Sequence, residues 1–163
     1  MKNSILLLVL LFLFSCADGI VLQDKEIEPW LRNNHEALTE IVNIFQSNEC
    51  LTRVEASWSE FIDQNCENEK IESDVESVLF ILRKLKLVLV TRDTLSDKSD
   101  PVIDIMLYRG RPDDANKGSA VSLAFIDEFP QELADELDCV PFKSDNYDKW
   151  YIWFWPNGSR WCN

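Results

Sequence analysis

The chain has 163 residues, with 16 Lys and Arg against 29 Asp and Glu and a formal net charge of −13. Its length suits one domain, and a hydrophobic content of 46% is typical of a chain that folds around a core. The negative charge argues against nucleic acid and anionic membrane surfaces as partners, since both attract cationic proteins, and the single histidine excludes most histidine-based metal sites.

The N-terminus has the anatomy of a signal peptide. One cation, Lys2, precedes an apolar run over residues 5–14, and small residues follow the run. The run is far shorter than the ~20 apolar residues of a membrane-spanning helix. We therefore expect residues 1–15 to be a leader that is removed.

Residues 13–16, Leu-Phe-Ser-Cys, resemble the lipobox of bacterial lipoproteins. The resemblance covers residues 1–16 only, and Phe14 departs from the small or aliphatic residue usual at its position. It implies cleavage before Cys16, acylation of the Cys16 thiol and of the new amine, and a lipid-anchored tether over residues 16–27. Multiple acyl chains give a stable membrane anchor.

The sorting rule of the same family implies a location. Ala17, rather than an aspartate, follows the cysteine, which implies the outer membrane of the cell envelope, with the protein facing the periplasm. The alternative is ordinary secretion with cleavage after Ala17, which would leave a soluble periplasmic or secreted protein. Within the tether, residues 20–22 (Ile-Val-Leu) are an expected docking point.

Three helices are predicted before residue 86. Apolar residues recur at helical spacing over residues 31–45, with Pro29 suited to the first turn. A second stripe covers residues 51–62, and a helix over residues 50–64 accommodates it. A third stripe covers residues 71–85.

The pattern then changes to that of strands, because β-branched and apolar residues alternate or cluster in short runs. Strands are predicted over residues 87–91, 102–108, 120–125 and 150–155, with a short helix over residues 130–137.

Helices that precede a run of adjacent strands indicate an α+β fold. We expect three N-terminal helices packed on one face of a mostly antiparallel sheet of four to five strands. Residues 28–163 would form this single domain.

Four cysteines remain once Cys16 is set aside: Cys50, Cys66, Cys139 and Cys162. An even number in an exported protein predicts two disulfides. A helix over residues 50–64 would hold Cys50 and Cys66 roughly 20 Å or more apart, whereas disulfide-bonded Cα atoms lie about 4.4–6.8 Å apart. The prediction is therefore that these two cysteines pair with Cys139 and Cys162, in either order.

The strand over residues 150–155 carries aromatic residues on both faces. Trp150, Ile152 and Phe154 share one face, and Tyr151, Trp153 and Trp155 share the other. One set should pack on the helices. Tyr151, Trp153 and Trp155 are candidate binding residues for a sugar or a partner protein, unless other parts of the chain cover them as well.

Residues 127–138 contain six carboxylates and no Lys or Arg. Such a segment would attract a basic partner, and Asp135, Glu136 and Asp138 are the candidate binding residues within it. The alternative is a solvated face that keeps the protein soluble.

Motifs of catalysis and cofactor binding are absent from the sequence. It contains no glycine-rich phosphate loop, no G-x-S-x-G and no C-x-x-C. His35 is predicted to be a surface residue of the first helix. No catalytic residue, metal ligand or cofactor is therefore assigned.

These features together predict a small acidic envelope lipoprotein that is a non-catalytic protein-binding module. Its partner would be a basic envelope protein, as for an inhibitor or an immunity-type protein, and it would meet the membrane only through its lipid anchor. One alternative is a glycan- or peptidoglycan-binding lipoprotein that uses the aromatic strand, and another is an unrecognised hydrolase. Nucleic acid is not an expected partner.

Overall fold

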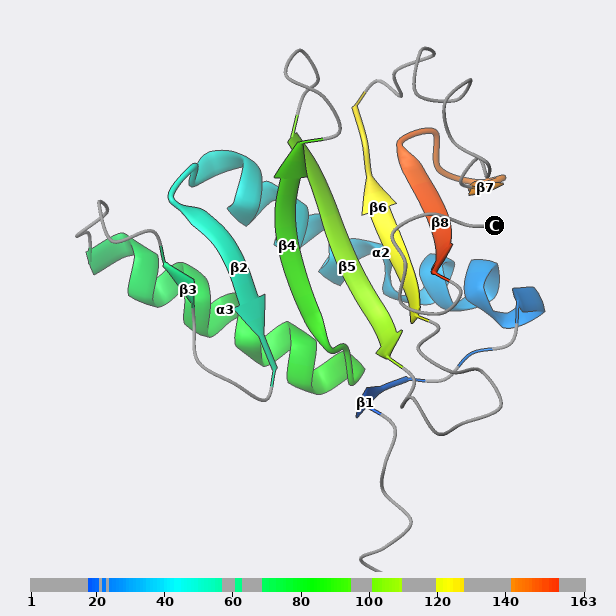
Figure 1. Ribbon diagram of the computed structural model, residues 1–163, viewed down its shortest axis with the longest axis horizontal. Coiled ribbons are helices and arrows are strands. Elements are labelled where there is room, and N and C mark those ends of the chain that lie inside the picture. The colour runs from blue at the N-terminus through cyan, green and yellow to red at the C-terminus, as the bar shows by residue number, and fades with distance from the viewer. Residues whose placement is uncertain are drawn as a thin grey trace, which may run out of the picture.

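The computed structural model describes residues 18–20, 22, 24–56, 61–62, 69–94, 101–109, 120–127 and 142–155. In this part of the chain, helices α2 (Asp24–Ser47) and α3 (Glu69–Leu85) lie on the same side of one sheet (Figure 1). The strands are β1 (Asp18–Gly19), β2 (Leu51–Glu55), β3 (Phe61–Ile62), β4 (Leu89–Thr94), β5 (Pro101–Arg109), β6 (Ala120–Phe125), β7 (Phe142–Lys143) and β8 (Trp150–Trp155). The fold is α+β.

The sheet is antiparallel throughout. Its strand order is β3-β2-β4-β5-β6-β8-β7, and β1 pairs with β5 off this path. Strands β1, β3 and β7 have two residues each. The remaining strands are the five longer ones, which agrees with the four to five strands predicted, and the short strands extend the sheet beyond that prediction.

The predicted helix over residues 50–64 is wrong. Strand β2 occupies Leu51–Glu55 and pairs with β3, so the described residues contain two helices and not the three predicted. The pairing register shifts between Leu51 and Arg53. Leu51 and Val54 both lie in the core although they are three residues apart. This irregularity gives a strand the apolar spacing of a helix.

Helix α2 begins earlier than predicted and shortens the expected tether. It starts at Asp24, so Pro29 lies inside the helix and not in its first turn, and Ile27 is fully buried. Ile20 and Leu22, which precede the helix, pack against the core. This confirms the docking expected for that segment. The predicted tether over residues 16–27 is therefore wrong in its C-terminal part, which belongs to the folded domain.

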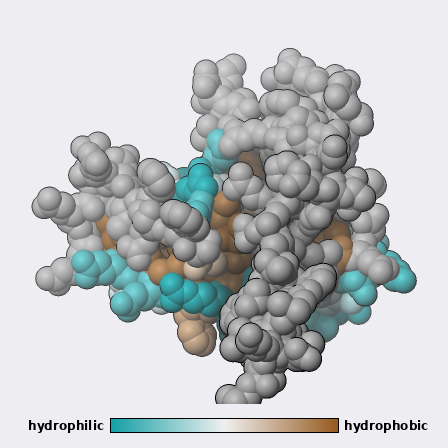
Figure 2. All heavy atoms as spheres, turned by 60° about the horizontal axis from the view of Figure 1, so that its bottom comes forward, coloured by the Kyte–Doolittle hydropathy of each residue, from teal (hydrophilic) through white to brown (hydrophobic). Residues whose placement is uncertain are grey.

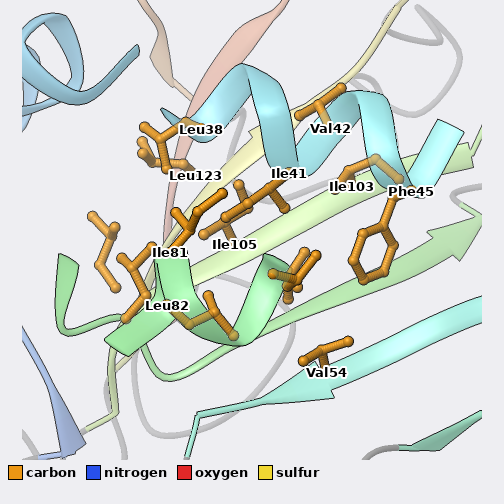
Figure 3. Packing of buried hydrophobic residues seen from close by; sticks show 14 of the residues in the cluster. Leu38, Ile41, Val42, Phe45, Val54, Ile81, Leu82, Ile103, Ile105 and Leu123 are labelled. Atoms are coloured by element: carbon orange, nitrogen blue, oxygen red, sulfur yellow. The ribbon is translucent and has the colours of Figure 1, made fainter. Parts of the chain in front are cut away.

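The main core lies between the two helices and the sheet face that they cover (Figure 3). Aliphatic side chains, Phe45 and Trp150 fill it, and burial of one Val, Leu, Ile or Phe side chain contributes about 1.5–3 kcal/mol. The labelled members are Leu38, Ile41, Val42 and Phe45 from α2, Ile81 and Leu82 from α3, and Val54, Ile103, Ile105 and Leu123 from the strands.

Candidate functional site

The structure describes only some of the residues that the sequence singles out. Tyr151 and Trp153 are described, as are Cys50 and the backbone of Trp155. Those outside the described residues are Cys16, Cys66, Cys139, Cys162, Asp135, Glu136 and Asp138. Lipidation of Cys16 and the binding role of Asp135, Glu136 and Asp138 therefore stay predictions.

Strand β8 divides its side chains between the two faces of the sheet as predicted. Trp150 and Ile152 lie in the core beneath the helices. Tyr151 and Trp153 lie on the opposite face, where they pack against Val102, Ala124 and Ile126. Both rings are half-buried, so packing covers part of the surface predicted to bind a ligand.

Tyr151 stands at the end of a row of side chains that crosses five strands on this outer face. The strand registers align Arg53, Thr91, Asp104, Ala124 and Tyr151. At about 4.8 Å per strand, the row is roughly 19 Å long. Arg53 forms an ion pair with Glu55 of the next row.

The parallel row ends at Trp153. It consists of Glu55, Leu89, Met106, Ser122 and Trp153. Leu89 and Ser122 of this row are buried, whereas Met106 between them is half-buried. The outer face of the sheet therefore combines polar, apolar and aromatic groups, and the β6 members of both rows, Ser122 and Ala124, are buried.

An open groove lies along the solvent side of α2. It has a volume of about 660 Å³, and the described residues that line it are His35, Glu36, Thr39, Glu40, Asn43, Ile44 and Ser47. Glu36 and Glu40 are both exposed and stand one helical turn apart. The described lining contains no lysine or arginine. We call this feature the acidic groove.

The wall of the acidic groove contains a hydroxyl group without a partner. Thr39 Oγ1 is buried and has no hydrogen-bond partner within the described part of the chain. Burial of an unsatisfied hydroxyl is costly, so a polar ligand atom that reached Thr39 would recover a lost hydrogen bond.

The turn between β7 and β8 contacts α2 at His35, the first of the residues that line the acidic groove. Glu28 of α2 holds this turn, since its carboxylate accepts hydrogen bonds from Ser144 Oγ at 3.1 Å, from the Asp145 backbone N–H at 3.1 Å and from Asn146 Nδ2 at 3.0 Å. The next residue, Tyr147, stacks on His35. Tertiary contacts therefore fix the position of the histidine.

The acidic segment predicted over residues 127–138 begins beside the C-terminal end of the groove. Gln46 of α2 donates a hydrogen bond from Nε2 to Asp127 Oδ2 at 3.5 Å. Lys149 also forms an ion pair with Asp127. Residues 128–138 lie outside the described residues.

Arg92 lies on β4 and is not among the residues that line the acidic groove. Burial lowers the pKa of its guanidinium, and the carboxylate of Glu49 opposes this by raising it. Arg92 therefore provides a positive counter-charge for Glu49, which is not among the residues that line the groove.

The described residues contain no group of three or more side chains suited to bind a metal ion. Within the same part of the chain, neither helix has the length and apolar character needed to cross a membrane. No family model matches the chain, and comparison with curated proteins and with solved structures gave no match.

Sequence reasoning did not find the acidic groove. The periodicity of residues 31–45 predicts the apolar face of α2, and the remaining positions form a polar face. On that polar face, Glu36 and Glu40 look like ordinary surface residues in the sequence. The groove residue His35 also stacks on Tyr147, a contact between distant parts of the sequence that forms only in the folded protein.

Proposed function

We propose that this protein is an envelope lipoprotein that binds a basic protein through the acidic groove and is not an enzyme. The observation that carries the proposal is the pair of exposed carboxylates, Glu36 and Glu40, in an open groove whose described lining has no cation. Opposite charges across an interface speed association and select the partner.

The dimensions of the acidic groove suit a segment of protein. From His35 to Ser47 the helix axis rises about 18 Å, at 1.5 Å per residue. That length accommodates several turns of helix or a short extended segment of a partner. The carboxylate of Asp127 lies next to Gln46 at one end, so the acidic segment that follows in the sequence would add to the attraction.

A protein partner is favoured over a glycan because of the burial of the outer sheet face. Sugar binding on an aromatic platform needs open ring faces. Tyr151 and Trp153 are half-buried and pack on Val102, Ala124 and Ile126, which leaves less ring area for stacking.

The lipid anchor enters the proposal through the lipobox-like residues that end at Cys16. Their resemblance to lipoprotein leaders supports acylation at this cysteine, and the residue after it supports the outer membrane. Replacement of Cys16 by Ser should abolish labelling with palmitate and release the protein from membranes. A variant that is still labelled would contradict the anchor.

The binding proposal is tested by capture of partners from an envelope extract, followed by kinetics with the captured protein. The double variant Glu36→Lys/Glu40→Lys should lower the association rate about tenfold, and added salt should lower the wild-type rate in the same direction. The matched control is Glu72→Lys/Glu76→Lys, which reverses two exposed carboxylates at the same spacing on α3.

The two double variants separate a specific groove from a general effect of charge. Equal losses in both would show that only net charge matters, and no loss in the first would remove the acidic groove from the interface. A ligand whose binding responds to Trp153→Ala but to neither charge reversal would favour the glycan alternative, because a neutral sugar is not steered by charge.

A further inference from the structure

The chain enters the fold at one end of the sheet, directly after the proposed anchor. Asp18 pairs with Arg109 and Gly19 with Tyr108, and the Ile20 backbone N–H donates to the Leu107 carbonyl at 2.9 Å. One residue separates Cys16 from Asp18 in the sequence, and each step between consecutive Cα atoms covers only about 3.8 Å. An acylated Cys16 would therefore hold this end of the sheet against the membrane.

The C-terminus of α3 lies at the same end of the molecule (Figure 1). A Cβ atom placed on Gly19 would stand 2.6 Å from Val88 Cγ2, so the segment that leads from α3 into β4 contacts β1. Arg83 and Lys84 occupy the last turn of α3, and Lys86 follows that turn. We call these three cations the basic pole.

The basic pole is free to meet another surface. All three side chains are exposed, and none forms an ion pair with a residue that the structure describes. Phe80, one turn earlier on α3, is 67% exposed and is the one exposed large hydrophobic side chain in the described part of the chain. Phe80, Arg83 and Lys84 share the walls of a shallow depression with Glu76 and Leu79.

Hydrophilic and hydrophobic side chains lie next to each other at this end of the molecule, which Figure 2 brings forward. Exposed cations beside an exposed aromatic ring are typical of surfaces that rest on lipid headgroups, because the charges meet phosphates and the ring reaches the boundary of the acyl chains.

We infer that the basic pole lies on the anionic lipid headgroups of the membrane that carries the anchor. The inference rests on the proposed acylation of Cys16. The net charge of −13 argues against recruitment of the whole protein to such a surface, but the anchor provides the attachment and the basic pole only sets the orientation. The surface potential falls off within a Debye length of about 8–10 Å, so distant carboxylates contribute little repulsion. Glu76 is the one carboxylate among the described residues of the depression, against two cations there.

This orientation exposes the acidic groove to the periplasm. The Gln46–Asp127 contact marks one end of the groove, and Asp127 follows Phe125 and Ile126 after the end of β6. Phe125 pairs with Ile103 near the start of β5, whereas β1 pairs with the end of β5. The two ends of β5 therefore separate the basic pole from the groove opening next to Asp127.

The test uses the acylated protein in lipid nanodiscs of phosphatidylglycerol and phosphatidylethanolamine, with a gadolinium chelate on a fraction of the headgroups. Amide protons close to the headgroups relax faster. Those of Lys84, Lys86 and Val88 should relax strongly, while those of Gln46 and Asp127 should not. Equal relaxation at both ends of the molecule would overturn the inference.

The variant Arg83→Gln/Lys84→Gln/Lys86→Gln should lower the equilibrium constant for the oriented state by roughly 100-fold. Each cation near an anionic surface contributes about 1 kcal/mol, and 1.4 kcal/mol is a factor of ten. Lys143→Gln, which removes an exposed lysine of β7, is the control and should leave the relaxation pattern unchanged. A triple variant that keeps the wild-type pattern would show that the anchor alone sets the orientation.

Failure of the anchor and failure of the basic pole are distinguishable. The mass of the N-terminal peptide, measured before the discs are assembled, reports acylation of Cys16. An unmodified peptide would contradict both the lipoprotein proposal and the inferred contact of the basic pole with the membrane, which depends on it. An acylated peptide without selective relaxation at the basic pole would overturn this inference alone.

Discussion

The imidazole ring of His35 stacks on the phenol ring of Tyr147, with the ring centroids 3.8 Å apart and the planes inclined by 10°. Trp150 approaches the same imidazole edge-on, with a centroid distance of 6.2 Å. These contacts join α2 to the β7–β8 turn and the start of β8. His35 is half-buried, so its prediction as a simple surface residue is wrong.

We expect the His35–Tyr147 stack to contribute to stability beyond the burial of its two members. Stacked aromatic pairs couple by about 0.5–1.5 kcal/mol. A double-mutant cycle with His35→Ala and Tyr147→Ala, followed by urea denaturation, should return a coupling free energy in that range. Glu36→Ala, at an exposed neighbouring position, should change the free energy of unfolding by less than about 0.5 kcal/mol. Strict additivity in the cycle would contradict the prediction.

Helix α3 ends with a lysine in the left-handed conformation. Lys86 has φ 56°, the Leu87 N–H donates to the Leu82 carbonyl at 2.8 Å, and the Lys86 N–H donates to the Arg83 carbonyl at 3.3 Å. This is the Schellman arrangement, in which glycine is the preferred residue because it has no Cβ. The helix therefore ends at a conformation that is costly for lysine.

Lys86→Gly should raise the free energy of unfolding by about 1 kcal/mol. A non-glycine residue in the left-handed conformation costs roughly 1–2 kcal/mol, which glycine avoids. Glycine also gives the unfolded chain more conformational entropy, which offsets part of this gain. Thermal denaturation measures the change. Lys84→Gly, inside α3, should instead lower stability by about 1 kcal/mol. If both variants lost stability, the strain at Lys86 would be refuted.

Gly19 is the point at which the N-terminal strand docks on β5. Its φ is +102°, and a Cβ atom at this position would stand 2.1 Å from the Leu107 carbonyl oxygen. Gly19→Ala should therefore detach β1 from β5. Hydrogen exchange at the Ile20 amide, which donates to that carbonyl in the wild type, should become much faster. Asp18→Ala, next to it in β1, should leave this amide protected, and equal protection in Gly19→Ala would contradict the prediction.

The sequence was sufficient to predict the elements whose periodicity is regular. The apolar stripes of α2 and α3 and the alternation of β6 come from long, uninterrupted patterns. Strand β2 was misread because its register shift places Leu51 and Val54 on one face, and the start of α2 was misplaced because Pro29 lies inside the helix. The acidic groove could not be predicted, since the periodicity of α2 does not show which part of its polar face borders an open hollow. The contacts of Glu28 and His35 with the β7–β8 turn likewise form only in the folded protein.

The disulfide prediction changes with the fold of residues 51–62. Cys50 is disulfide-bonded, and the other four cysteines lie outside the described residues. The argument against a bridge to Cys66 assumed a helix over residues 50–64. In its place, β2 and β3 form an antiparallel pair in which Leu51 stands opposite Ile62, so the chain returns toward Cys50 before it reaches Cys66.

A second contact brings the chain that follows Cys66 in the sequence close to Cys50. Asn48 Nδ2 donates to Asp74 Oδ2 of α3 at 3.1 Å, so the chain before and after Cys66 is held close to Cys50. Cys139 and Cys162 flank β7 and β8 in sequence, and three strands separate β8 from β2, about 19 Å at the usual strand spacing. We therefore expect non-reducing peptide mapping to find Cys50 bonded to Cys66 and Cys139 bonded to Cys162. A peptide that joins Cys50 to either C-terminal cysteine would reject this pairing, because it would require one of these segments to cross the sheet.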